Sequence, residues 1–146
     1  MPESSAHAAL VRTIVQFALR ELGPLADIAI REDAVNPIRH EKPPRIDRYV
    51  PDVFATDVPT TRTLIGEAKT LRDIETDHTR RQVSTFLNYL SKTPGGVFVL
   101  SVPLQGRAPA QRLLSELRRP YPGSTTPTVV LDPSVTHHWQ LPDAKS

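Results

Sequence analysis

Three segments of the chain repeat apolar residues every three to four positions, which is the spacing of an α-helix with one buried face. The first covers residues 6–22 and is followed by Gly23-Pro24, a pair that ends helices. The second begins at about Thr76, and the third covers residues 108–119. Each segment also has a polar face, so we expect three helices that pack against a common inner layer.

Four further segments have the patterns of β-strands and predict that inner layer. Residues 26–31 alternate apolar and polar positions, and residues 48–70 contain two strands joined by a polar turn. Residues 97–102 form a continuous apolar run, typical of a strand buried on both faces, and a last short strand covers residues 127–131. The order αβββαβαβ predicts an α/β fold, with a mixed central sheet of four or five strands flanked by helices.

Length and composition limit the class of protein. The chain has 146 residues, and we expect one domain over residues 1–146 with a proline-rich tail from about residue 132. Hydrophobic residues make up 38% and charged residues 23%, as in soluble globular proteins. There is no cysteine, which excludes disulfides and thiolate zinc sites. With no bilayer-length apolar run and no signal-peptide pattern, we expect a cytoplasmic protein with no membrane partner.

The two strands within residues 48–70 carry the strongest chemical signal. Side chains alternate along a strand, so Glu67 and Lys69 share one face of the second strand, while Leu64, Gly66 and Ala68 form a small apolar surface on the other. A hairpin can bring Asp52 on the first strand beside Glu67. Two adjacent carboxylates favour a hard cation such as Mg²⁺. The simpler alternative is that Glu67 and Lys69 form an ordinary surface ion pair.

Pro51-Asp52 followed by Glu67-Ala68-Lys69 in a hydrophobic strand resembles the PD-(D/E)XK nuclease superfamily, over roughly residues 6–102. The resemblance implies a restriction-endonuclease-like fold and a Mg²⁺-dependent nuclease, with Mn²⁺ as a possible substitute, that hydrolyses DNA phosphodiester bonds. It implies that Asp52, Glu67 and the Ala68 carbonyl bind the metal. Lysine has a reference pKa of about 10.4. We therefore expect Lys69 to position the attacking water and stabilise charge on the phosphate rather than to act as a strong base.

Two polar residues on the predicted helices are further candidates for this site. Glu21 lies seven residues after Ile14, near the edge of the first apolar stripe, and first-helix acids bind metal in several branches of the family that the chain resembles. Gln82 flanks the stripe of the second helix, where that family often has a polar catalytic group. The alternatives are a frayed, solvated Glu21 and an ordinary boundary glutamine.

Basic residues on three segments are candidate nucleic-acid contacts, because lysine and arginine neutralise phosphate charge. They are Arg39 and Lys42 in the connection before the hairpin, Arg80 and Arg81 on the second helix, and Arg107 and Arg112 on the third. The alternatives are a solvated loop for the connection and, for Arg80 and Arg81, ion pairs with Asp77 or other acids within the same helix. The net charge of +2 permits a nucleic-acid partner but does not by itself indicate one.

We therefore expect DNA as the partner, with RNA also compatible, and a homodimer or a subunit of a larger complex. Two other functions remain open. One is a non-cutting nucleic-acid-binding or assembly protein on the same fold, and the other is an unrelated α/β interaction module. The position of Asp52 relative to Glu67 separates them, because carboxylates more than about 10 Å apart cannot share one metal ion. His137 and His138 are adjacent and have no third ligand in view, which disfavours a second metal site.

Overall fold

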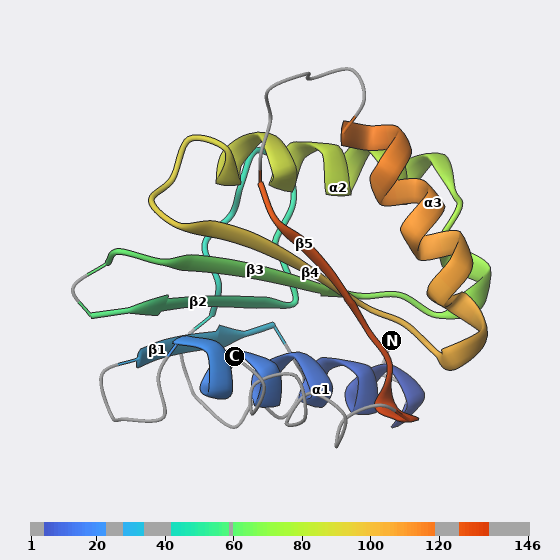
Figure 1. The fold of residues 1–146 in the computed structure, drawn as a ribbon, viewed down its shortest axis with the longest axis horizontal. Coiled ribbons are helices and arrows are strands. Elements are labelled where there is room, and N and C mark those ends of the chain that lie inside the picture. The colour runs from blue at the N-terminus through green and yellow to red at the C-terminus, as the bar shows by residue number, and fades with distance from the viewer. Residues whose placement is uncertain (1–4, 23–27, 34–41, 59, 119–125, 135–146) are drawn as a thin grey trace, which may run out of the picture.

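A computed structural model describes residues 5–22, 28–33, 42–58, 60–118 and 126–134 of the chain (Figure 1). It has the α/β architecture that the sequence predicts, with helices flanking a five-stranded mixed sheet. The elements are α1 (Ser5–Leu22), β1 (Ile28–Glu32), β2 (Val53–Asp57), β3 (Thr63–Ala68), η1 (Leu71–Asp73, a 3₁₀-helix), α2 (Asp77–Leu90), β4 (Gly96–Ser101), η2 (Leu104–Gly106, also 3₁₀), α3 (Arg107–Arg118) and β5 (Thr128–Leu131). Within the described ranges, no helix is long and apolar enough to cross a membrane.

The strands lie side by side in chain order, β1-β2-β3-β4-β5. The first three are antiparallel neighbours, while β3 pairs with β4 and β4 with β5 in parallel. Each parallel neighbour is reached through a helix, α2 or α3, as parallel pairing requires. The carboxyl ends of β3, β4 and β5 therefore share one edge of the sheet, which is on the right in Figure 1.

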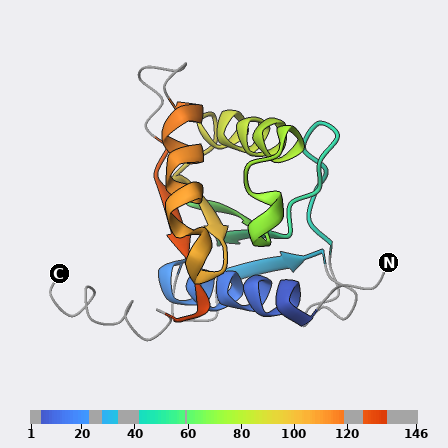
Figure 2. The ribbon, with the colours of Figure 1, turned by 90° about the vertical axis from the view of Figure 1, so that its right-hand side faces the viewer.

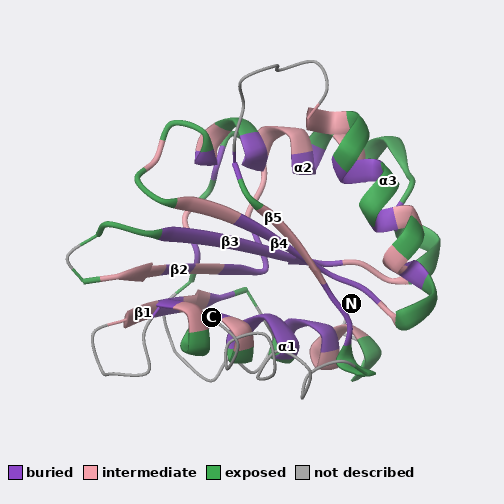
Figure 3. Ribbon diagram, viewed as in Figure 1, coloured by how far each residue is buried: buried purple, intermediate pink, exposed green. Residues whose placement is uncertain are grey.

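Helices cover both faces of the sheet. Helix α1 lies across one face, in contact with β1 to β4, and α2 and α3 cover the other (Figure 1). Two separate clusters of buried apolar residues result, one centred on α1 and one between the sheet and the α2–α3 layer. Strand β3 is buried along its whole length between them, as Figure 3 shows in purple. Any charged group on β3 must therefore find its partners inside the protein.

The apolar face of β3 is the surface on which α1 packs. Gly66 is the critical position, because a Cβ atom built there would lie 2.4 Å from Cγ2 of Ile14. The absence of a side chain lets α1 approach the middle of the sheet. A buried hydrogen bond of 2.8 Å from Ser101 Oγ to the carbonyl of Leu10 fastens the helix to β4 as well. The expectation that Leu64, Gly66 and Ala68 provide a packing surface for a helix is confirmed.

The polar turn between β2 and β3 is built around Asp57. Its carboxylate accepts hydrogen bonds from the backbone N–H groups of Thr61 and Arg62, 2.8 Å each, and from the Thr61 hydroxyl. These bonds, the hydroxyl's above all, lower the pKa of Asp57. Asp57 thus closes the turn that sets the β2–β3 register.

We predict that Gly66→Ala destabilises the protein by about 1–3 kcal/mol, because the added methyl group overpacks Ile14. At a strand position without such a contact, replacing glycine by alanine should leave the stability unchanged or raise it. A loss of stability at position 66 would therefore identify the close contact with Ile14. Urea unfolding of Gly66→Ala, Ile14→Ala and the double variant measures it. The double variant should lose less stability than the sum of the single variants, since Ile14→Ala makes room for the methyl group. Simple additivity would contradict the contact.

Candidate functional site

The acidic residues of the hairpin meet at the carboxyl end of β3. The β2–β3 ladder pairs Val53 with Gly66, so the next residues outward, Asp52 and Glu67, are opposite each other. In Figure 2, which looks onto this edge of the sheet, α1 lies below, α2 above, α3 on the left, and residues 42–51 rise on the right. In α/β proteins, the carboxyl ends of parallel strands are the usual place for ligands.

Two reciprocal hydrogen bonds join Asp52 to β3. The backbone N–H of Asp52 donates to Glu67 Oε1 at 3.1 Å, and the backbone N–H of Ala68 donates to Asp52 Oδ2 at 2.8 Å. Asp52 is 9% exposed and Glu67 4% exposed. The two carboxylates, which we call the acidic pair, are thus buried neighbours with defined orientations. The sequence-based expectation that a hairpin brings them together is confirmed.

Within the acidic pair, the pKa of Glu67 is raised well above its usual value. Burial is the main cause, and the negative charge of Asp52 adds to it. Lys69 acts in the opposite direction, with its Nζ atom 3.5 Å from Glu67 Oε2 and its side chain 12% exposed. The opposing effects leave ionised Glu67 poorly compensated, so the site favours an additional positive charge.

Ala68 orients a third oxygen toward the acidic pair. In an extended strand, the N–H and C=O of one residue point toward the same side. The N–H of Ala68 bonds to Asp52, so its carbonyl also points to the side of β3 on which Asp52 lies. Two carboxylates and a carbonyl form a set of hard oxygen donors of the kind that Mg²⁺ prefers.

Gln82 is the one predicted polar candidate on α2, and it is buried, with 7% exposure. It lies among the residues with which α2 covers the sheet, on the same face of the sheet as Ile65 and Glu67. Its Oε1 atom is buried without a hydrogen-bond partner. Unpaired buried polar atoms are rare in native proteins and commonly mark a place where a ligand or water binds. Gln82 therefore remains a candidate.

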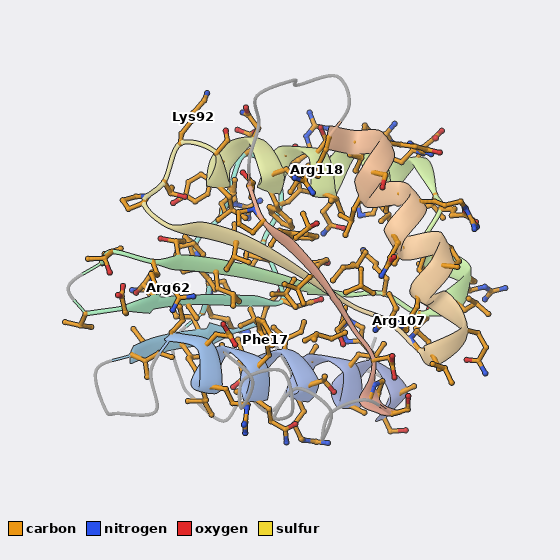
Figure 4. All side chains as sticks on the ribbon, in the orientation of Figure 1. Phe17, Arg62, Lys92, Arg107 and Arg118 are labelled. Carbon is orange, nitrogen blue, oxygen red and sulfur yellow. The ribbon has the colours of Figure 1, made fainter. Side chains whose placement is uncertain are left out.

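Glu21 does not lie near the acidic pair, and the expectation that it binds the same metal is wrong. Its side chain lies 4.0 Å from Arg62, just before the amino end of β3, and Arg62 also donates to the Glu21 carbonyl. Figure 4 shows Arg62 at the opposite end of the sheet from Arg107. Glu21 instead helps to line a separate hollow of about 610 Å³, together with Phe17, Arg62, Gly96 and Val129 among others.

His7, in the first turn of α1, takes the position expected of Glu21. Its Nε2 atom lies 3.5 Å from Oδ2 of Asp52. Sequence reasoning missed it, although a signal existed. His7 lies seven residues before Ile14 on the apolar stripe of α1, just as Glu21 lies seven residues after it. Fourteen residues of helix span about 21 Å, so only one end of the stripe can reach the site.

Glu32, at the end of β1, is a buried acid that the sequence analysis also did not single out. It pairs with Val53 across the β1–β2 ladder and is 5% exposed. Its Oε2 atom is buried without a hydrogen-bond partner. It lies on the α1 face of the sheet with Ile30, whereas Glu67 lies on the α2 face. Among the described residues, no hydrogen bond or ion pair joins Glu32 to the acidic pair.

The predicted basic residues differ in how they are engaged. Four of them contact acids: Lys42 with Asp33 at 3.5 Å, Arg80 with Glu116, Arg107 with Asp132 at 3.1 Å, and Arg112 with Glu75 at 3.6 Å. Arg80 thus forms an ion pair, as the alternative predicted, but with an acid of α3 rather than of its own helix. Arg107 also donates to the carbonyl of Val130, so it anchors β5. Arg81 forms no ion pair within the described ranges. Arg39 lies outside the described residues, as do His137 and His138.

Comparison with protein-family models, with curated proteins and with solved structures finds no match for this chain. In the part of the chain that the structure describes, no three histidine, aspartate or glutamate side chains are grouped closely enough to hold a metal ion by themselves. The donor set at the acidic pair is smaller, two carboxylates with one carbonyl. It fits a cation that completes its coordination with water, as Mg²⁺ usually does.

We predict that Glu67→Gln stabilises the metal-free protein at neutral pH. The pKa of Glu67 is raised in the folded state, so its favourable contribution is complete below the unfolded value near 4.5 and is lost as pH rises through the folded value. Glutamine mimics the protonated side chain and removes that loss. Urea unfolding between pH 4 and pH 8 should therefore show a flatter pH dependence for the variant.

The exposed acid Glu75 offers a matched control, and Glu75→Gln should leave the pH dependence of stability nearly unchanged. Added Mg²⁺ should raise the melting temperature of the wild type but not that of Glu67→Gln, since a ligand stabilises the state that binds it. If Mg²⁺ raised the melting temperatures of both proteins equally, the metal would bind somewhere other than the acidic pair.

Proposed function

We propose that this protein is a metal-dependent nuclease that hydrolyses phosphodiester bonds of DNA at the acidic pair, on a fold of the restriction-endonuclease type. The observation that supports the proposal is the buried contact between Asp52 and Glu67, with Lys69 3.5 Å from Glu67. Such an arrangement raises the energy of the empty site, because like charges lie close together in a desolvated place. A catalytic role accounts for that cost, since functional sites retain locally unfavourable groups.

The metal would be held by Asp52, Glu67 and the carbonyl of Ala68. Mg²⁺ or Mn²⁺ bound there would polarise the scissile phosphate and lower the pKa of the attacking water. The backbone N–H groups that bond to each carboxylate keep its oxygens in place before any cation arrives. This preorganisation limits the rearrangement required on binding.

Lys69 and Gln82 would act on the substrate rather than hold the metal. The ammonium group of Lys69 offers three donors and no acceptor, so it suits a phosphate oxygen or a water directed at phosphorus. It stabilises negative charge that grows on the phosphate in the transition state. The unpaired Oε1 of Gln82 accepts a hydrogen bond and would orient that water. His7, beside Asp52 Oδ2, helps to set the charge and position of that carboxylate.

A second function is favoured by the same hydrogen bonds. They fasten β2 to β3 beyond the last pair of the ladder, which is also a structural role. In a protein that binds nucleic acid or another partner without cutting, the acidic pair would serve only to join the strands. The two functions differ in what a conservative change does, because glutamine and asparagine can keep hydrogen bonds but not the negative charge.

We predict that plasmid DNA is cleaved in the presence of Mg²⁺ or Mn²⁺ and that a chelator stops the reaction. Ca²⁺ should support binding but little cleavage, because its looser coordination orients the reacting groups less strictly. Asp52→Asn, Glu67→Gln and Lys69→Ala should each abolish turnover while their unfolding curves show an intact fold. Agarose gels and urea unfolding of the same preparations measure both. Wild-type cleavage by Lys69→Ala would refute the nuclease assignment, and a folded wild type without cleavage would favour the non-cutting function.

We further predict that Gln82→Ala lowers the cleavage rate by about 10–100-fold, the usual cost of losing a group that supports a metal site. Glu21→Ala is the matched control on α1, and it should retain the wild-type rate because Glu21 contacts Arg62 at the other end of the sheet. Single-turnover kinetics at saturating Mg²⁺ measures the chemical step for both variants. If Glu21→Ala lost more of the cleavage rate than Gln82→Ala, the active site would lie at the end of the sheet where Glu21 contacts Arg62.

A further inference from the structure

A tight turn beside α2 presents an arginine that has no acidic partner among the described residues. The backbone N–H and C=O groups of Ile46 and Tyr49 bond to each other, at 2.7 and 3.0 Å, and close a two-residue turn at Asp47-Arg48. Asp47 has a φ of 54°, in the left-handed region that aspartate tolerates better than most residues. The turn is well anchored, because Ile46 is buried in the core beneath α2. Arg48 is exposed at its tip.

Tyr49 positions this turn against α2. Its ring makes edge contacts with His78 and Phe86, with ring centres 5.8 and 6.3 Å apart. Figure 2 shows the segment that contains the turn, residues 42–51, rising beside α2 on the side away from α3. The turn is therefore held at a fixed distance from the outer surface of the helix.

A hollow of about 690 Å³ lies between the turn and α2. It is lined by Asp47, Arg48, Tyr49, Arg81, Ser84 and Thr85. Neither arginine forms an ion pair with any described acid, and the Ser84 hydroxyl has no hydrogen-bond partner in the same part of the chain. Thr85 is already engaged, since its hydroxyl donates to the Arg81 carbonyl. Two guanidinium groups and one hydroxyl thus converge against the single charge of Asp47.

We propose that this hollow binds a backbone phosphate of the DNA strand, a few nucleotides from the bond that is cut. The inference rests on the proposed nuclease function and adds the site that holds the strand. A guanidinium group matches a phosphate with two parallel hydrogen bonds. The other predicted arginines of α2 and α3, Arg80, Arg107 and Arg112, already contact acids, which makes the unpaired Arg48 and Arg81 the better phosphate ligands.

The position of the hollow suits this role. Arg48 lies four positions before Asp52, and an extended chain spans at most about 14 Å over that distance. Successive phosphates of one strand rise about 3.4 Å along the helix axis. A strand whose scissile phosphate lies at the acidic pair therefore passes within reach of Arg48 a few nucleotides away. Contacts of this kind hold the strand in place without reading its sequence.

The test is DNA binding by fluorescence anisotropy, with a labelled duplex and Ca²⁺, in a Lys69→Ala background so that no cleavage occurs. Arg48→Ala and Arg81→Ala should each weaken binding by about tenfold, as expected for a charge-assisted hydrogen bond. Each should reduce the slope of log affinity against log salt by about 0.9. Arg20→Ala, an exposed arginine in the last turn of α1, is the matched control and should change neither value.

Asp47→Asn should strengthen DNA binding, in contrast to the two arginine substitutions. Asparagine also tolerates a positive φ, so the turn should survive, while the loss of the one negative charge in the hollow should tighten DNA binding severalfold. Inorganic phosphate should compete only at high concentration, because it lacks the neighbouring charges of a strand. A purely structural role for Asp47 predicts weaker binding or none.

The possible outcomes separate this proposal from the nuclease function. If DNA binding depends on Arg48 and Arg81 but the wild-type protein cleaves no DNA, the phosphate site in the hollow is supported and the nuclease function is refuted. If neither substitution affects cleavage or DNA binding, the phosphate site in the hollow is refuted while the nuclease function is not. A wild-type protein that binds no DNA at all would overturn both.

Discussion

Two hydrogen bonds beside the β2–β3 ladder fix the position of the acidic pair. The backbone N–H of Asp52, the residue just before β2, donates to the Glu67 carboxylate, and the backbone N–H of Ala68, the last residue of β3, donates to the Asp52 carboxylate. Like charges at directly opposed positions are normally unfavourable in a sheet. The bonds compensate in part by satisfying one oxygen of each acid, and Lys69 compensates further. The charge that remains unfavourable at this buried pair is what the proposed metal ion would offset.

The same strand supports that site from its opposite face. Gly66 has no side chain, so α1 packs closely on β3 at Ile14 and reaches Asp52 with His7. The face of β3 toward α2 carries Glu67, and Gln82 is buried on the side of α2 that covers this face. Two cores thus hold the end of one strand from both sides. A rigid support of this kind keeps reacting groups in place, which a site on mobile loops does less well.

Several surface cations contact acids within the molecule. On α2 and α3, Arg80 contacts Glu116 and Arg112 contacts Glu75, while Arg107 contacts Asp132 and the end of the edge strand β5. Exposed ion pairs of this sort contribute little stability, about 0–1 kcal/mol each. Arg48 and Arg81 form no ion pair with any described acid, and both line the hollow beside the turn at Asp47. The proposed phosphate contact therefore rests on these local charges rather than on the net charge of +2.

The sequence by itself determined the elements and the acidic pair. Apolar residues that repeat with a period of 3.6 or 2 predict helices or strands, because each element buries one face. A hairpin brings Asp52 opposite Glu67 because the turn sets the register of the two strands. Only the tertiary structure decided which end of the α1 stripe meets that pair. Glu21 and His7 are equivalent by spacing, yet the direction in which α1 crosses the sheet places His7 there. Long-range packing sets that direction, and no local pattern encodes it.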